Sequence, residues 1–272
     1  MAGIGGNFTK QQMTGDVSFT PNCLLGNWQV CKKTRIVPQL RPVALRSAEP
    51  AGLPCFGDVV LVKSLGNGGV LALSLAEKPL GVLEGEHRKL HCASASTGAT
   101  ARTAFQLHSY DGKTGPVHFD DKVVLVSAGD LFGDEVIAFV HSELPPVGSQ
   151  ASDQRVTLRI LPADGSSIPY SAAFSVVPAR FDARLGLRGQ PIGSDAITLV
   201  HARSGKRIAG LREAMLTDFG AEFMVSAQTM QAKGAVHQLT GERDGKRNIT
   251  GYGVKGDGEE NQWELVRAGP GQ

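Results

Sequence analysis

Three residues near the end of the first third of the chain come closest to a metal-binding motif: His87, His91 and Cys92. The two histidines are four positions apart, and on a helix this spacing places both imidazoles on one face, as in zinc-binding helices. A structural zinc site takes four ligands, and no second cluster follows at short spacing, so Cys55 would have to complete it. We favour the alternative, a surface helix with incidental histidines, and expect no metal and no other cofactor.

Motifs for catalysis are missing from the rest of the sequence. There is no Gly-x-Ser-x-Gly nucleophile elbow, and the glycine-rich stretches 3–6 and 66–69 lack the Lys-Ser/Thr element of a phosphate-binding loop. The acidic pairs 120–121 and 259–260 are neighbours in sequence, and neighbours on a strand point to opposite faces, so neither forms an acid/base pair. The sequence favours a protein without catalytic residues; an enzyme using the histidine–cysteine motif is the alternative.

The first 54 residues are the basic part of the chain and could bind an acidic surface. They carry six basic and two acidic residues, whereas the whole chain has a net charge of only +2. Apolar residues lie between the basic ones, which is unusual for a purely solvating tail. We interpret residues 1–53 as an extended arm that becomes ordered against its own domain or a partner; a solvated linker is the alternative. The expected contacts with a partner are Trp28, Lys32, Lys33, Arg35, Arg41 and Arg46.

Composition limits the class of protein. The net charge is too small to indicate nucleic acid as a partner, and no apolar run is long enough to cross a membrane. Residues 1–10 contain no apolar stretch typical of a signal peptide, so we expect a cytosolic protein whose four cysteines are free thiols. The 34 glycines among 272 residues favour many tight turns and an all-β fold.

From residue 56 onward, short apolar runs alternate with turn residues. Residues 59–63 and 70–75 are predicted strands around a glycine-rich turn, and the stretch 82–92 is the one predicted helix. Further predicted strands occupy residues 103–108, 123–126, 136–140, 156–160, 173–177, 197–200, 222–226 and 263–266.

An internal repeat organises these strands. Asp58, Asp121 and Asp195 each precede a run of β-branched residues that ends in Leu-Val. We infer three lobes (about 54–118, 119–191 and 192–268) that close together into one β-trefoil-like, MIR-like barrel over residues 54–268, because closure removes exposed sheet edges. The lobes are long for this fold, so we expect inserted loops at 76–102, 142–155 and 227–248.

A family resemblance rests on several short motifs. Residues 192–208 resemble the opening of MIR-type β-trefoil repeats, and Asn261-Gln262-Trp263-Glu264-Leu265-Val266 resembles the last strand of that fold. With Gly26-Asn27-Trp28 in the arm, Phe56-Gly57-Asp58-Val59-Val60-Leu61-Val62 and Arg102-Thr103-Ala104-Phe105, nearly the whole chain is similar to the family of cilia- and flagella-associated protein 161, which are microtubule inner proteins.

The resemblance implies a structural role. It implies docking on the luminal wall of the A-tubule in ciliary and flagellar doublets, with α/β-tubulin and neighbouring inner proteins as partners, so that the axoneme is stabilised and motility supported. Tubulin is acidic, which suits a basic arm. The alternative is a cytosolic β-trefoil that binds carbohydrate or another ligand. Against it, the two tryptophans and three tyrosines do not recur at equivalent positions of the lobes, as stacking residues for sugars would.

Overall fold

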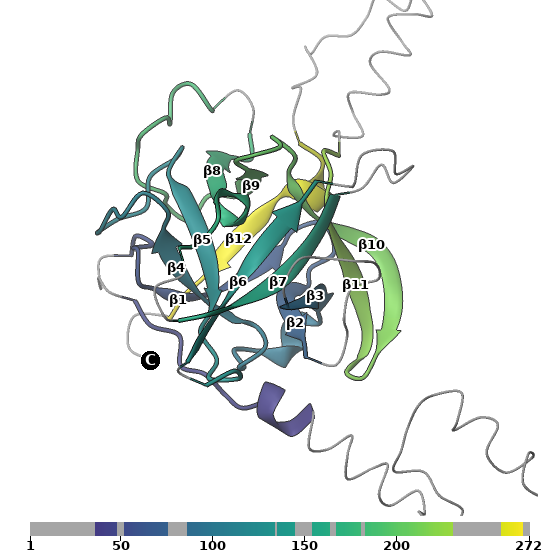
Figure 1. The fold of residues 1–272 in the computed structure, drawn as a ribbon. Coiled ribbons are helices and arrows are strands. Elements are labelled where there is room, and N and C mark those ends of the chain that lie inside the picture. The colour runs from purple at the N-terminus through teal and green to yellow at the C-terminus, as the bar shows by residue number, and fades with distance from the viewer. Residues whose placement is uncertain are drawn as a thin grey trace, which may run out of the picture.

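The computed structural model describes residues 36–47, 52–75, 86–133, 135–144, 154–163, 167–180, 183–230 and 257–268. Over these residues the fold is all-β, as the sequence predicts, with short 3₁₀ turns and one helical turn at residues 36–39 (Figure 1). The strands are β1 (Val59–Ser64), β2 (Val70–Ser74), β3 (Glu86–Ala93), β4 (Ala104–Ser109), β5 (Lys122–Ser127), β6 (Val136–Glu143), β7 (Gln154–Pro162), β8 (Phe174–Pro178), β9 (Ile197–His201), β10 (Ile208–Thr217), β11 (Gly220–Ala227) and β12 (Trp263–Val266). The 3₁₀ turns are η1 (Ala95–Thr97), η2 (Tyr170–Ala172) and η3 (Glu259–Asn261).

Six of these strands form a closed ring. In the order β1, β4, β5, β8, β9 and β12, each strand pairs antiparallel with the next. The ring closes where β12 pairs with β1, from Leu61 opposite Val266 to Ser64 opposite Trp263. Because each ring strand has a partner on both sides, closure removes the free edges that an open sheet of these strands would have.

The remaining strands form three hairpins, β2–β3, β6–β7 and β10–β11. They contact one another through the pairs β3–β7, β3–β11 and β7–β11. In sequence order, the described strands therefore fall into three successive units of four, which begin with β1, β5 and β9.

The aspartate of the predicted repeat has a structural role in the first two units. A carboxylate oxygen of Asp58 accepts a hydrogen bond from the backbone N–H of Cys55 at 2.9 Å, and Asp121 does the same for His118 at 2.8 Å. Each bond fixes the turn that leads into the first strand of its unit. In the third unit, Asp195 is exposed.

Replacing Asp121 with asparagine is expected to destabilise the fold only where the carboxylate is ionised. Burial raises the pKa of Asp121, but the hydrogen bonds and charges of Lys113 and His118 outweigh it, and the pKa ends below its usual range. A lowered pKa contributes stability above the usual value near 4 and loses it as the pH falls further. Urea unfolding should show Asp121→Asn less stable by about 1 kcal/mol at pH 7. The difference between the two proteins should shrink as the pH is lowered toward about 3, where the carboxylate becomes protonated.

Asp195→Asn is the matched control for this experiment, because the same aspartate of the repeat is exposed in the third unit. This control should unfold like the unmodified protein at both pH values. A deficit of Asp121→Asn that is equally large at pH 7 and pH 3 would contradict the role assigned to the charge.

The predicted helix over residues 82–92 is wrong for its described part, because residues 86–93 form strand β3. This strand pairs with β2 from Val70 opposite Ala93 to Ser74 opposite Lys89, and it also pairs with β7. Leu90 and Cys92 enter the hydrophobic core at alternate positions, so the period of two that a strand requires was present in the sequence. The expected inserted loop 76–102 thus contains a strand, whereas most of 142–155 and 227–248 lies outside the described residues.

The second half of the predicted arm lies on the domain. Gln39 is buried, its side-chain oxygen accepts a hydrogen bond from the N–H of Leu75, and its backbone carbonyl accepts one from Arg102. Pro42 forms an isolated bridge with Thr100, and Arg46 exchanges two backbone hydrogen bonds with Val59 at the start of β1. Residues 36–47 are therefore ordered against their own domain. The expected boundary near residue 54 falls between this segment and the parts of the domain to which it is hydrogen-bonded.

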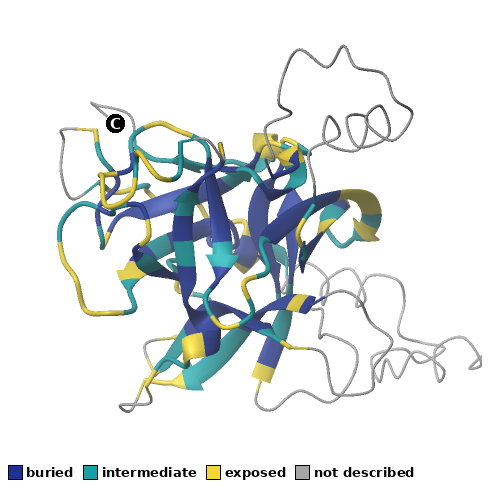
Figure 2. Ribbon diagram, turned by 90° about the horizontal axis from the view of Figure 1, so that it is seen from above, coloured by how far each residue is buried: buried dark blue, intermediate teal, exposed yellow. Residues whose placement is uncertain are grey.

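The main hydrophobic core lies between the ring and the three hairpins. Figure 2 shows the dark blue buried strands at the centre of the molecule and the exposed residues on turns and hairpin ends. Trp263 of β12 is fully buried there, as predicted, and its indole N–H donates to the carbonyl of Ile208 at 3.0 Å. Among the described residues, no helix has the length and apolar character needed to cross a membrane.

Candidate functional site

One face of the sheet segment β3–β7–β6 carries buried polar side chains. Thr157 of β7 lies opposite Lys89 of β3 and His141 of β6, so these residues share a face with His87, two positions before Lys89. Leu158 and its neighbours on the other face enter the main core. His87, His141 and Thr157 are nonetheless buried, so this face is covered by other parts of the protein.

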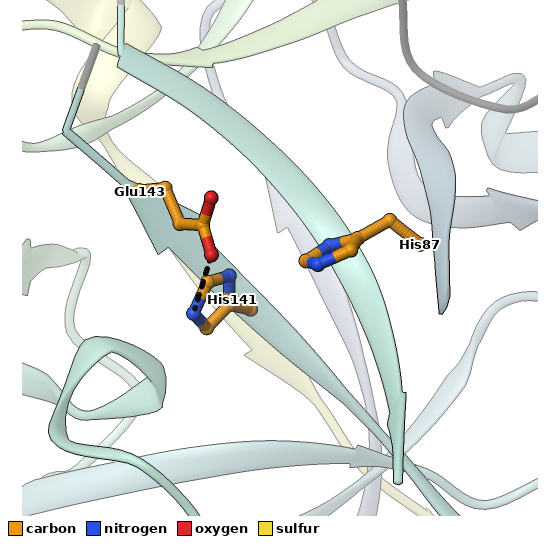
Figure 3. Close-up of side chains that lie close together, drawn as sticks. All are labelled: His87, His141 and Glu143. Carbon is orange, nitrogen blue, oxygen red and sulfur yellow. Dashed lines mark ion pairs between the residues drawn. The ribbon is translucent and has the colours of Figure 1, made fainter. Parts of the chain in front are cut away.

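The side chains of His87, His141 and Glu143 point toward one another, as Figure 3 shows. One possible ligand atom from each residue lies within 4.8 Å of the others. Oε1 of Glu143 is 3.7 Å from Nε2 of His141, and the two imidazole rings are 5.4 Å apart between centroids. This arrangement brings together strands from the first and second units.

Hydroxyl groups hold both imidazoles in place. Nδ1 of His87 lies 2.9 Å from Oγ1 of Thr157, and Nε2 of His141 lies 2.7 Å from Oγ of Ser171 in η2. The backbone carbonyl of Ser171 is in turn 3.0 Å from Nε2 of His201 on β9. The polar cluster therefore extends across parts of all three units.

Burial determines the protonation of the central histidine. It is the largest factor that lowers the pKa of His141 to about 3, and the nearby charges of His87, Arg159, His201 and Arg203 act in the same direction. The imidazole of His141 is therefore neutral at physiological pH. A neutral imidazole is the form that hydrogen-bonds through one nitrogen and offers a lone pair on the other.

The residues of the histidine–cysteine motif do not meet at one site, because they lie on a strand and not on the predicted helix. His87 and His91 lie on the same face of β3, but Cys92 points to the opposite face and enters the core. Burial raises the pKa of the Cys92 thiol to about 12; the charge of Glu222 raises it further, against a hydrogen bond from Asn67. Such a thiol is not a reactive or metal-binding thiolate. The structure groups His87 with His141 and Glu143 instead.

Of the six expected contact residues in the arm, the structure describes Arg41 and Arg46, and these two differ in their surroundings. Arg41 is exposed, and its guanidinium lies 3.4 Å from the carbonyl and 3.7 Å from the carboxylate of Asp130. Arg46 is fixed through its backbone to β1. Trp28, Lys32, Lys33 and Arg35 lie outside the described residues, so contact of the arm with a partner stays a prediction.

The acidic pairs 120–121 and 259–260 and the basic residues near β10 take part in ion pairs. Asp120 pairs with Arg188 at 2.8 Å, and Glu259 pairs with Arg212 at 2.8 Å. Arg207 pairs with Asp257 at 2.8 Å. These charges serve local structure, and Asp257 does so while buried.

Arg102, the first residue of a resemblance motif, is buried and joins the first and third units. Arg102 is 0% exposed and its two terminal nitrogens donate to the two carboxylate oxygens of Glu222 on β11, at 2.7 and 3.0 Å. Its Nε donates to the carbonyl of Leu73, and the guanidinium lies 3.6 Å from the ring centroid of Phe219. All three nitrogens of this guanidinium donate within the fold, which indicates a structural role.

A pocket of about 730 Å³ lies between β3, β7, β10 and β11. Its lining includes Met215, Met224 and Met230 together with the basic residues Lys89 and Arg155. The described residues that line it include no tryptophan, tyrosine or phenylalanine, and so provide no aromatic platform on which a sugar ring could stack.

Comparisons with known proteins inform the fold alone. No family model and no curated protein matches the chain. Among solved structures, a Caenorhabditis elegans protein of unknown function is 14% identical over 80% of this chain and 97% of its own, with a TM-score of 0.52. The Saccharomyces cerevisiae protein O-mannosyltransferase Pmt1–Pmt2 complex bound to the sugar donor is 14% identical over 86% of this chain, with a TM-score of 0.51; the match covers only 28% of that chain.

Proposed function

We propose that this chain is a non-enzymatic structural protein of the ciliary or flagellar axoneme, a microtubule inner protein that docks on the luminal wall of the A-tubule through a β-trefoil. The closed ring of six strands and the three hairpins that meet beside it support the trefoil, because three four-strand units are what a threefold repeat requires. The three aspartate-led runs of the sequence coincide with β1, β5 and β9.

The observation that carries the proposal is the place of the resemblance motifs in the fold. Residues 56–62 lead into and form most of β1, residues 102–105 hold the buried arginine and begin β4, and residues 261–266 end in β12, which closes the ring. Their buried side chains pack or bond within the architecture. These motifs specify a rigid scaffold, which is what docking through a surface of fixed shape requires.

Arm and domain would act together in docking. A closed barrel presents its surface in a fixed shape, so little conformational entropy is lost when it binds. Residues 36–47 run along the domain, and four of the six basic residues of the arm precede them in sequence. Charge attracts this segment to acidic tubulin, and two linked contacts on one chain raise the affinity above that of either alone. Neighbouring inner proteins are the other expected partners.

Deleting residues 1–35 is expected to leave the domain folded and to weaken its retention in axonemes. The deletion ends at residue 35 because Gln39 and its neighbours are bonded to the strands, so removal of residues 1–53 would also damage the fold. A tagged full-length chain, expressed in a flagellated cell, should co-fractionate with detergent-extracted axonemes and resist a salt wash, while the truncated chain should be washed out. The triple change Lys32→Glu, Lys33→Glu and Arg35→Glu should be released at lower salt than the unmodified chain.

Two measurements separate loss of docking from loss of folding. Circular dichroism and urea unfolding of the purified truncated chain should match those of the full-length protein. If the truncated chain stays in salt-washed doublets, the arm is not the docking element. If the full-length chain never co-fractionates with axonemes, the proposed location itself fails.

A ligand-binding β-trefoil is the second candidate, and the pocket beside β10 and β11 is the observation in its favour. The pocket is large enough for a small ligand, but its methionine-rich and basic lining does not suit sugars. Saturable binding on a glycan array would favour this candidate over docking on tubulin.

A further inference from the structure

The cluster formed by β3 and β6 has the donor set of a metal site. We propose that His87, His141 and Glu143 bind a single divalent transition-metal ion, with Zn²⁺ as the expected occupant. Two imidazole nitrogens and one carboxylate oxygen are a ligand set that zinc takes in proteins, with the fourth position left to water or another oxygen. The proposal is independent of the axonemal function, since it concerns side chains within the domain.

The partners of the imidazoles support ligation. A histidine that binds a metal through one ring nitrogen usually hydrogen-bonds through the other, which fixes the orientation of the ring. The hydroxyls of Thr157 and Ser171 lie within hydrogen-bond distance of one ring nitrogen each of His87 and His141. The hydrogen bonds of both rings thus come from strand β7 and from the 3₁₀ turn η2, which fix them from outside the cluster.

A separate observation is the second nitrogen of His141. The side chain is only 1% exposed, and its Nδ1 is buried with no hydrogen-bond partner among the described residues. An unsatisfied buried polar atom costs about 1–3 kcal/mol, so native proteins rarely keep one without a reason. With Nε2–H donating to Ser171, Nδ1 keeps its lone pair, and a cation bound at this nitrogen would satisfy it.

The distances require only local adjustment. Donors around a tetrahedral zinc lie about 3.4 Å apart when each is about 2.1 Å from the ion. The carboxylate of Glu143 is 3.7 Å from Nε2 of His141, and one possible ligand atom of each of the three residues lies within 4.8 Å of the others. Glu143 is the last residue of β6 and its side chain is 32% exposed, so it can move toward the histidines.

The neighbouring charges set the strength expected of the site. Glu143 supplies one negative charge, whereas the positive charges of Arg159 and Arg203 act on His141 and oppose a second cation nearby. We therefore expect weaker binding than at a structural site with four protein ligands. Because β3 and β6 belong to different units, the bound ion would fasten the first hairpin to the second.

Metal analysis of the full-length protein tests the proposal. The chain should be purified without a histidine tag or chelator, and elemental analysis should find close to one zinc per chain after loading and gel filtration. Cobalt(II) should give the intense visible absorption of a tetrahedral site. Zinc at a hundredfold excess over its Kd should raise the midpoint of thermal unfolding by about 5–10 °C.

Matched variants decide which residues bind. Glu143→Gln and His87→Gln should each weaken zinc binding at least tenfold, with Glu143→Gln as the variant least disturbing to the fold because its side chain is partly exposed. His91→Gln is the control, since His91 lies on the same strand and face but outside the cluster. No saturable zinc binding, or equal binding by the unmodified chain and Glu143→Gln, would overturn the assignment. Loss of binding in His91→Gln alone would also do so.

Discussion

Replacing Arg102 with alanine is expected to lower the free energy of unfolding by about 3–5 kcal/mol, because the change leaves the carboxylate of Glu222 buried without its counter-ion. The side chains of this pair are only 1% and 3% exposed, so water cannot replace the lost guanidinium without opening the fold. The carbonyl of Leu73 and the ring of Phe219 lose their contacts at the same time. Equilibrium unfolding in urea or guanidinium measures the effect.

The double variant Arg102→Met with Glu222→Leu separates a lost charge pair from lost packing. Apolar residues of similar volume that replace both members of a buried pair often restore stability. We expect the double variant to recover most of the loss caused by Arg102→Ala. If Arg102→Ala costs less than about 1 kcal/mol, the pair does not hold the first and third units together in the way we infer.

Replacing Trp263 with alanine is expected to cost about 3–5 kcal/mol, since it removes the largest fully buried side chain from the core and leaves a cavity. Trp263 also lies on β12, where it pairs with both Ser64 and Ile197 at the closure of the ring. Trp263→Phe keeps most of the apolar volume but loses the N–H donor to Ile208. That carbonyl retains a bond from Asn261, so we expect a smaller loss of about 1–2 kcal/mol for phenylalanine.

Leu216→Ala is the control for this series, because Leu216 on the β10–β11 hairpin is 87% exposed. Its unfolding midpoint should match that of the unmodified protein. Denaturant unfolding followed by circular dichroism suits all three variants, since both Trp263 variants lose one of the two tryptophans of the chain and their fluorescence could not be compared with that of Leu216→Ala. Equal stability of Trp263→Ala and Leu216→Ala would show that β12 is not needed for the closed ring.

The strands that form the ring could be predicted because their signal is local. Val59 to Val62, Val123 to Val126 and Ile197 to Val200 are runs of β-branched and aliphatic residues behind an aspartate, and all three became first strands of a unit. Strand β3 could not be separated from a helix in this way. Its histidines four positions apart fit both periods, and only its pairing with β2 and β7 decides for a strand.

The candidate site could not be predicted from the sequence, for a different reason. His87 and His141 are 54 positions apart, and Arg102 and Glu222 are 120 apart, so both contacts exist only after distant strands have paired. The one sequence signal for the cluster is that His141 and Glu143 alternate on a strand and therefore share a face. The sequence offered His87 only in a motif with His91 and Cys92, which we interpreted as incidental, and on strand β3 the Cys92 thiol points into the core.

The pairing of β12 with β1 has a consequence for how the protein is made. Strand β1 can pair with β12 only after about 200 further residues have been synthesised, since Leu61 lies opposite Val266. Until Trp263 to Val266 have left the ribosome, one edge of β1 is available to other chains, and chaperones that shield strand edges would act in this interval. A nonsense mutation anywhere before these last strand residues should therefore remove the whole protein from the cell by proteolysis rather than leave a shortened but folded product.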